Sequence, residues 1–165
     1  MQEKFVSYTE ELNAIDYFEK TAIYLSSIRN NIQDWKWVFI SLHGAIYALA
    51  IIVARGTNDV SVLQGNRVIG TRDALKKCVE KGALSNEDIE RECLGRLIKE
   101  FRGGFEHYAP GVWSIQESGL RKITKCVFDV ACKLLNSHSH FHYEIGENKR
   151  LELALNKIEK ELRMF

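Results

Sequence analysis

The sequence predicts an all-α protein that folds as an up-and-down helical bundle, in one domain over residues 1–165. Only one proline occurs in the 165 residues, which disfavours loop-rich and all-β folds. Apolar residues recur every three or four positions in successive segments, as they do in amphipathic helices. The length is enough for one domain with a hydrophobic core and short for two.

Charge and cysteine content limit the possible classes of function. The chain has 23 Lys and Arg residues against 22 Asp and Glu, so any RNA contact must come from a local patch rather than an overall field. The four cysteines lack Cys-x-x-Cys spacing and lie in apolar helical patterns, which predicts free thiols in a reducing compartment. They are Cys78, Cys93, Cys126 and Cys132. The N-terminus lacks the layout of a signal peptide, so a cytoplasmic protein is expected.

The first predicted helix is amphipathic and ends near residues 30–31. A Ser7-x-x-Glu10 capping box is expected at its start. Its apolar positions are spaced by three and four residues. They are Leu12, Ile15, Phe18, Ala22, Leu25 and Ile28.

The second predicted helix covers residues 35–55, with Asp34 as its N-cap. Its middle, residues 37–54, is apolar nearly all round, and at the helical rise it would be about 27 Å long, close to a membrane core of about 30 Å. Ser41, His43 and Gly44 dilute this run, and the neighbouring helices are amphipathic. We therefore expect burial in a bundle or dimer rather than a membrane span.

Residues 56–70 predict a structured loop that contains a small hairpin over residues 63–68. No Gly-Lys-Ser/Thr follows Gly65-Asn66, so a phosphate-binding loop is not supported. Thr71 is expected to cap a short helix that runs to Lys81 and ends at Gly82.

The fourth predicted helix starts at Ser85, which can form a capping box with Asp88. It runs as one helix to Gly103-Gly104, where we expect it to loosen or end, because glycine lowers helix stability. Arg102 and His107 would lie about 140° apart on an ideal helix. A distortion, or a second copy of the chain, is needed to bring them to one phosphate.

Arg102 and His107 carry the main chemical signal of the sequence. Arginine is a permanent cation, and histidine can give or take a proton near neutral pH, so the pair suits phosphate chemistry. The alternative interpretation is a surface arginine and a hydrogen-bonded histidine at a helix end.

The Arg102-x-x-x-x-His107 spacing resembles the motif of HEPN (higher eukaryotes and prokaryotes nucleotide-binding) domains, many of which are ribonucleases. Further matches to small bacterial HEPN-like proteins extend over residues 34–120. They are Asp34-Trp35-Lys36-Trp37, Leu42-His43-Gly44-Ala45, Gly56-Thr57, Asp73-Ala74-Leu75 and His107-Tyr108-x-Pro110-x-x-Trp113-Ser114.

The resemblance implies a HEPN-like bundle with an additional C-terminal helix, and a homodimer with one composite cleft. It implies a metal-independent endoribonuclease without a cofactor, acting as a toxin or defence component with an antitoxin protein as partner. Arg102 and His107 would be catalytic, with Glu106, His43 and Trp113 in support.

Two alternatives remain open at this site. The residue after the motif arginine is commonly polar in the nucleases and is Gly103 here. A non-catalytic binding or dimerisation module is therefore the second hypothesis. His43 could be a hydrogen-bonded core histidine, and Trp113 a lid or a packing anchor.

The remaining segments predict two more helices. Ser118 is expected to cap the first, whose cations form either an RNA-facing patch or a solvated face. These cations are Arg121, Lys122, Lys125 and Lys133. His138, His140 and His142 alternate along the chain, but the ligand set is incomplete, so no metal site is expected. The final helix, residues 147–164, should complete the bundle rather than bind a partner.

Overall fold

The computed structural model describes residues 8–106, 114–137 and 145–164. Five long helices form it: α1 (Glu10–Ser27), α2 (Trp35–Arg55), α3 (Thr71–Glu80), α7 (Glu117–Ser137) and α8 (Ile145–Arg163). The shorter elements are the 3-10 turns Ile32–Asp34 and Asp59–Val62, strands β1 (Leu63–Gln64) and β2 (Arg67–Val68), helices α4 (Asn86–Ile89), α5 (Glu92–Arg96) and α6 (Arg102–Glu106), and a π-helical segment, Leu97–Phe101. The predicted all-α helical bundle is confirmed.

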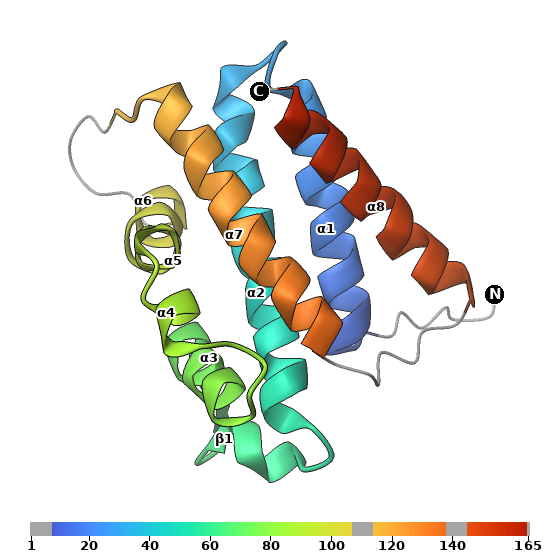
Figure 1. Cartoon of the computed structure of the whole chain (residues 1–165), viewed down its shortest axis with the longest axis vertical. Helices are drawn as coiled ribbons and strands as arrows, with labels where there is room; N and C mark the ends of the chain where they lie inside the picture. Colours follow the sequence, from blue (N-terminus) through green and yellow to red (C-terminus); the bar gives the residue numbers. More distant parts are fainter. Residues whose placement is uncertain (1–7, 107–113, 138–144, 165) are drawn as a thin grey trace, which may run out of the picture.

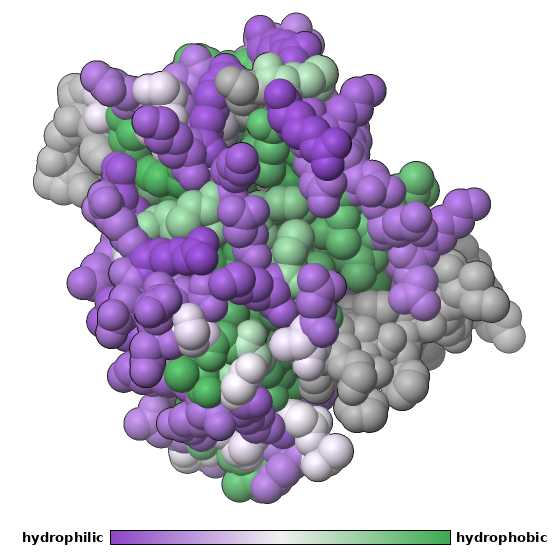
Figure 2. Space-filling view, viewed as in Figure 1, coloured by the Kyte–Doolittle hydropathy of each residue, from purple (hydrophilic) through white to green (hydrophobic). Residues whose placement is uncertain are grey.

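Helix α2 is the centre of the molecule. It packs against α1, α3 and α7 (Figure 1). Residues Ile32–Arg55 are long and apolar enough to cross a membrane, but 83% of their most apolar window is buried inside the protein. On the face shown in Figure 2, hydrophilic side chains surround smaller apolar areas. The predicted burial of this helix is confirmed and is consistent with a soluble protein.

Helices α1 and α2 pack in close contact. A Cβ atom added to Gly44 on α2 would lie 2.5 Å from the ring of Tyr17 on α1. A buried hydrogen bond of 2.9 Å joins the hydroxyls of Thr21 and Ser41 between the same helices. A side chain at position 44 would therefore require the Tyr17 ring, which is 37% exposed, to move from its place against α2.

The start of α1 differs from the prediction. The helix begins at Glu10, and the Thr9 hydroxyl accepts a 3.1 Å hydrogen bond from the Leu12 amide. Ser7, which was expected to form the capping box, lies outside the described residues. Threonine is itself a favoured N-cap residue, so the competing cap two residues later defines the helix start.

Asp34 occupies the N-cap position of α2 without capping it. Its carboxylate accepts hydrogen bonds from the Ser27 hydroxyl and from Asn31 Nδ2, the latter at 2.9 Å. These bonds join the end of α1 to the start of α2. The predicted position is correct, but the predicted capping bond is not made.

Two other caps also differ from the prediction. Gly70, not Thr71, is the N-cap of α3, and the Thr71 side chain is bonded elsewhere. Helix α7 begins at Glu117, one residue before the expected cap Ser118. The hairpin is confirmed, with Leu63 paired to Val68 in antiparallel register.

The helix expected after Ser85 is broken into several pieces. The capping box of Ser85 with Asp88 is present, as predicted. A turn at residues 90–91 then separates α4 from α5, and the π-helical segment joins α5 to α6. Gly103 and Gly104 lie inside α6, so the distortion that was expected at the glycines occurs one turn earlier.

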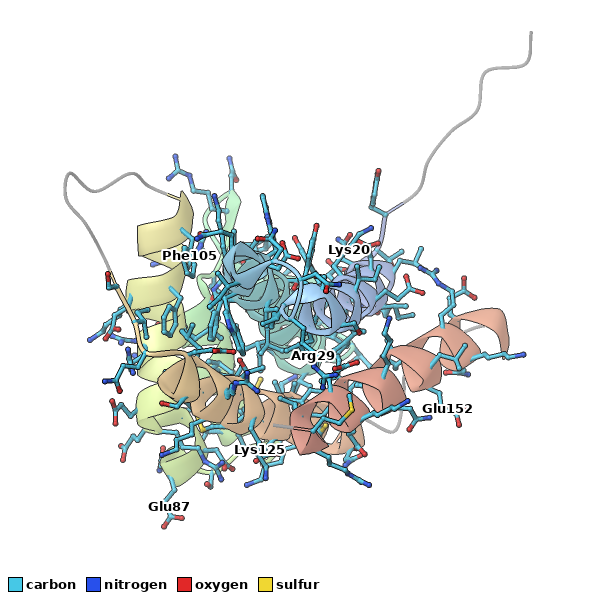
Figure 3. All side chains as sticks on the ribbon, turned by 90° about the horizontal axis from the view of Figure 1, so that it is seen from above. Lys20, Arg29, Glu87, Phe105, Lys125 and Glu152 are labelled. Atoms are coloured by element: carbon cyan, nitrogen blue, oxygen red, sulfur yellow. A yellow bond between two sulfur atoms is a disulfide. The ribbon has the colours of Figure 1, made fainter. Side chains whose placement is uncertain are left out.

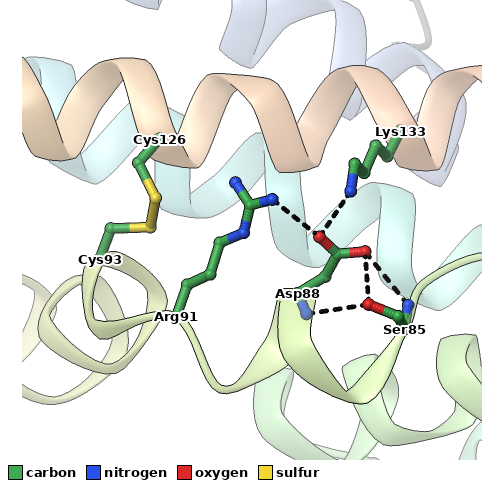
Figure 4. A network of polar contacts seen from close by, with 6 residues as sticks. All are labelled: Ser85, Asp88, Arg91, Cys93, Cys126 and Lys133. Carbon is green, nitrogen blue, oxygen red and sulfur yellow. Dashed lines mark hydrogen bonds and ion pairs between the residues drawn. A yellow bond between two sulfur atoms is a disulfide. The ribbon is translucent and has the colours of Figure 1, made fainter.

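The prediction that all four cysteines are free thiols is wrong. Cys93 on α5 and Cys126 on α7 form a disulfide with their Cα atoms 6.2 Å apart (Figure 4). The turn between α4 and α5 directs the short helix against α7, and this brings together two residues separated by 33 positions. Cys78 and Cys132 are free. Cysteine usage therefore no longer indicates a reducing compartment.

Helix α8 packs along α1 and completes the bundle, as predicted (Figure 1). Ala154 and Ile158 are buried in this contact. Arg150 donates two hydrogen bonds, of 2.9 and 2.7 Å, to the carboxylate of Glu19 on α1. The hydrogen bond from Arg150 lowers the pKa of Glu19 although burial opposes it.

Candidate functional site

The predicted site residues are distributed over three parts of the chain. His43 lies in the middle of α2, and Arg102 is the first residue of α6. Glu106 ends α6, but its side chain is not among those described. His107 and Trp113 lie outside the described residues. Of the five candidates, the structure describes the side chains of two, His43 and Arg102.

His43 and Arg102 line the same pocket, which has a volume of about 420 Å³. Residues from α1, α2, β2 and α6 form its wall. The remaining lining residues are Glu10, Asn13, Tyr17, Ile40, Gly44, Tyr47, Ala48, Ile51 and Val68. Two side chains far apart in the sequence are therefore brought to one cavity by the packing of α6 on α2.

The His43 ring is fixed in position by two neighbours. It is 6% exposed, and its Nε2 atom lies 3.1 Å from the Thr71 hydroxyl at the start of α3. The ring also stacks against Tyr47, with 6.4 Å between ring centroids. His43 is thus a hydrogen-bonded core histidine that also lines the pocket, and its role in a catalytic site stays a prediction.

Tyr47 is a pocket residue that the sequence reasoning did not select. Its hydroxyl donates a 2.7 Å hydrogen bond to the carbonyl of Ile69, next to the hairpin. Burial raises the pKa of this hydroxyl, and the positive charge of Arg102 opposes the increase. Tyr47 and Arg102 both line the pocket. The spacing of four residues from His43 places both rings on one face of α2 and could have indicated Tyr47.

The pocket combines one cation with one carboxylate among the described side chains that line it. Arg102 is exposed. Glu10 is bound through Oε2 to Arg55 at 3.1 Å. Arg55 also pairs with Glu11 at 3.0 Å, so it offsets the charge of Glu10 only in part. Among the described residues that line the pocket, Arg102 is the cation that could contact an anionic group.

The π-helical segment sets the direction of Arg102. The Arg102 amide donates to the carbonyl of Leu97, five residues earlier, instead of the four-residue spacing of an α-helix. Phe101 at the end of this segment is fully buried and stacks on Phe39 of α2, with 4.2 Å between ring centroids. Phe105 stacks on Phe101 in turn, with 6.0 Å between centroids. The aromatic contacts hold α6 on α2 and leave Arg102 at the pocket.

The segment that carries Arg102 is also anchored to α7. Asp88 accepts hydrogen bonds from the Ser85 amide at 3.1 Å and from Lys133 of α7 at 2.6 Å, and Arg91 lies 3.1 Å from the same carboxylate (Figure 4). Burial alone would raise the pKa of Asp88, but the hydrogen bonds from Lys133 and Ser85 outweigh it and lower the pKa. Seen from above in Figure 3, this side of the molecule, marked by Phe105, lies opposite α8.

The four predicted cations of α7 do not all face solvent freely. Arg121 is bonded to Glu117, and Lys133 to Asp88. Lys122 and Lys125 are exposed. Two of the four thus act in structural contacts, which favours the solvated-face interpretation over an RNA-facing patch.

The histidine run His138, His140 and His142 lies outside the described residues. Within the part of the chain that is described, no group of three or more His, Cys, Asp or Glu residues is placed to hold a metal ion.

Comparison of the chain with protein-family models, curated proteins and solved structures gave no match. The resemblance to HEPN domains therefore stays a prediction.

Proposed function

We propose that the protein is a metal-independent endoribonuclease of HEPN type. The observation that supports this function best is the shared pocket, in which Arg102 lies with His43 and Tyr47. An exposed guanidinium at the edge of a cavity is suited to contact a phosphodiester. The proposal includes a cytoplasmic toxin or defence role, with an antitoxin protein as partner.

The proposed reaction is attack by the RNA 2′-hydroxyl on the adjacent phosphate. Arg102 would stabilise the charge that develops on the phosphate oxygens, and a guanidinium can do this with two parallel hydrogen bonds. His107 would carry the proton between the hydroxyl and the leaving oxygen. His43, held by Thr71 at 3.1 Å, would line the cleft beside Arg102. Products with a cyclic phosphate end are expected.

The active form in this proposal is a homodimer. On a regular helix Arg102 and His107 lie about 140° apart, so one copy would offer its arginine and the other its histidine to the same phosphate. Glu106 and Trp113 belong to the same segment and would support the composite cleft. Light scattering of the purified protein at micromolar concentration tests this step, and a monomer would contradict it.

The second candidate function is a non-catalytic binding module. Gly103 favours it, because glycine cannot supply the polar side chain that commonly follows the motif arginine in the nucleases. A Cβ atom added at Gly103 would meet nothing within 4 Å. The substitution Gly103→Asn should therefore fold, and a gain of cleavage would show that the site lacks one hydrogen bond.

The deciding experiment is cleavage of unstructured RNA in the presence of a chelator. Wild-type protein should produce cyclic phosphate ends, His107→Ala should be inactive, and Arg102→Lys should be impaired because lysine lacks the planar fork of arginine. Lys122→Gln on α7, an exposed cation outside the pocket, is the matched control and should cleave normally. Intact RNA with both wild-type protein and Gly103→Asn would refute the nuclease proposal and leave the binding module.

A further inference from the structure

A second and larger pocket, of about 560 Å³, lies between α3 and the segment from α4 to the π-helical turns. Five cations line it, together with three glutamates. The cations are Arg72, Lys76, Arg91, Arg96 and Lys99. Three glutamates line the same groove, and two of the cations, Lys76 and Arg91, are also paired with Asp73 and Asp88. Individual exposed cations, rather than a net positive charge, are therefore what the groove offers to a ligand.

The cations of the groove are not equally available to a ligand. Arg96 is bonded to Glu100 at 3.0 Å, and Arg91 is paired with Asp88. Arg72 and Lys99 are exposed and form no ion pair within the described residues. These two side chains come from different elements, α3 and the π-helical segment, so they lie on opposite walls of the groove.

Two links connect this groove to the pocket that contains Arg102. Arg72 directly follows Thr71, whose hydroxyl lies 3.1 Å from Nε2 of His43 in that pocket. Lys99 precedes Arg102 by three residues, which places the two on neighbouring turns of one helical segment. Groove and pocket are thus connected along the chain, through the start of α3 and through the segment that carries Arg102.

We infer that this groove binds the sugar-phosphate backbone of the single-stranded RNA whose phosphate lies at Arg102. The inference rests on the proposed function. Arg72 and Lys99 would each contact a phosphate on opposite sides of the strand. Among the described residues, none of those that line the groove is aromatic. Binding through the backbone phosphates should therefore be tolerant of sequence and sensitive to salt.

The test measures the affinity of the full chain for a fluorescein-labelled 12-nucleotide single-stranded RNA at several salt concentrations, with chelator present. The variant is Arg72→Gln with Lys99→Gln. Each phosphate contact on a single strand contributes a slope of about 0.7, so the plot of log affinity against log salt should lose about 1.4 in slope. At 0.1 M salt this is an affinity loss of about 25-fold.

The matched control is Lys122→Gln with Lys125→Gln, which removes the same number of exposed cations from α7. Its slope and affinity should equal those of the wild-type protein. An unchanged slope in the groove variant, or an equal loss in the control, would overturn the inference. Equal affinity for a 12-base-pair RNA duplex would also overturn it, because the groove is assigned to a single strand.

The binding and cleavage measurements distinguish a wrong assignment of the groove from a wrong assignment of nuclease activity. If wild-type protein binds RNA with the expected slope difference but never cleaves it, the groove is supported and the nuclease proposal is not. If wild-type protein cleaves RNA and the groove variant keeps the wild-type slope and cleavage rate, the groove is refuted while the nuclease stands. Circular dichroism and thermal melting confirm that each variant is folded.

Discussion

Reduction of the Cys93–Cys126 disulfide should lower the stability of the protein substantially. The two residues are 33 positions apart and join α5 to α7. A cross-link restricts the unfolded chain more than the folded one, and for a loop of this length the chain-entropy relation gives about 3.7 kcal/mol at 25 °C. A domain of this size loses about 2 kcal/mol of stability per molar urea. The urea midpoint should therefore fall by about 2 M on reduction.

The assay is urea unfolding followed by circular dichroism, with and without a thiol reductant. The double variant Cys93→Ser/Cys126→Ser should match the reduced wild-type protein and should not respond to reductant. Cys132→Ser, which removes a thiol outside the disulfide, is the control that should keep the full response. A wild-type response below about 1 kcal/mol, or an equal response in the double variant, would refute the entropic argument.

Three further predictions concern Asp88, Gly44 and the two free cysteines. The pKa of Asp88 is lowered in the folded protein. The contribution of this carboxylate to the free energy of unfolding is therefore complete above its pKa in the unfolded chain, near 4, and is lost as the pH falls through its lower pKa in the folded protein. Asp88→Asn should lower the free energy of unfolding by about 1–2 kcal/mol at pH 7 and make the urea midpoint less dependent on pH below 4. A variant whose urea midpoint depends on pH as steeply as that of the wild-type protein would contradict this. Gly44→Ala should destabilise by about 1–3 kcal/mol, because the new methyl group meets the Tyr17 ring; an unchanged melting temperature would contradict this. Burial raises the pKa of Cys78 to about 12 and that of Cys132 to about 11. Both thiols should therefore resist iodoacetamide at pH 8 in the folded protein and react after unfolding. Rapid alkylation of the native protein would contradict this prediction.

The helices with long apolar repeats were predictable from the sequence. The burial of α2 followed from its composition, because a helix apolar on all sides must be covered by other helices. The hairpin at residues 63–68 followed from Gly65-Asn66, a turn sequence between two short strands. In each case the signal lies within a few neighbouring residues.

The break in the segment after Ser85 was not predictable in the same way. Its apolar residues keep a spacing that a continuous helix would also satisfy, so the turn at residues 90–91 and the π-helical segment depend on contacts with α2 and α7. The disulfide needs that break, because only then does Cys93 reach Cys126. Contacts between segments far apart in the sequence determine both the break and the disulfide, and the spacing of apolar residues does not indicate such contacts.

Two of the candidate site residues selected from the sequence, His43 and Arg102, line one pocket in the structure. Arg102 was selected from its spacing to His107, and His43 from the resemblance to HEPN domains. Their common pocket results from the stacking of Phe39 on Phe101, which no local pattern indicates. Tyr47 was missed because a tyrosine in an apolar helix is equally typical of a core residue.

The π-helical segment makes the direction of Arg102 depend on the hydrogen-bond register of a single turn. The Arg102 amide bonds to Leu97; a change to α-helical bonding would give that carbonyl to Phe101 instead and turn the following residues by about 100°. Arg102 would then leave the pocket, and the stack of Phe101 on Phe39 would be lost with it. The contact between Phe101 and Phe39 thus fixes both the hydrogen-bond register of the segment and the direction of Arg102. A substitution at Phe39 would therefore change the direction of Arg102 without altering any residue of the pocket.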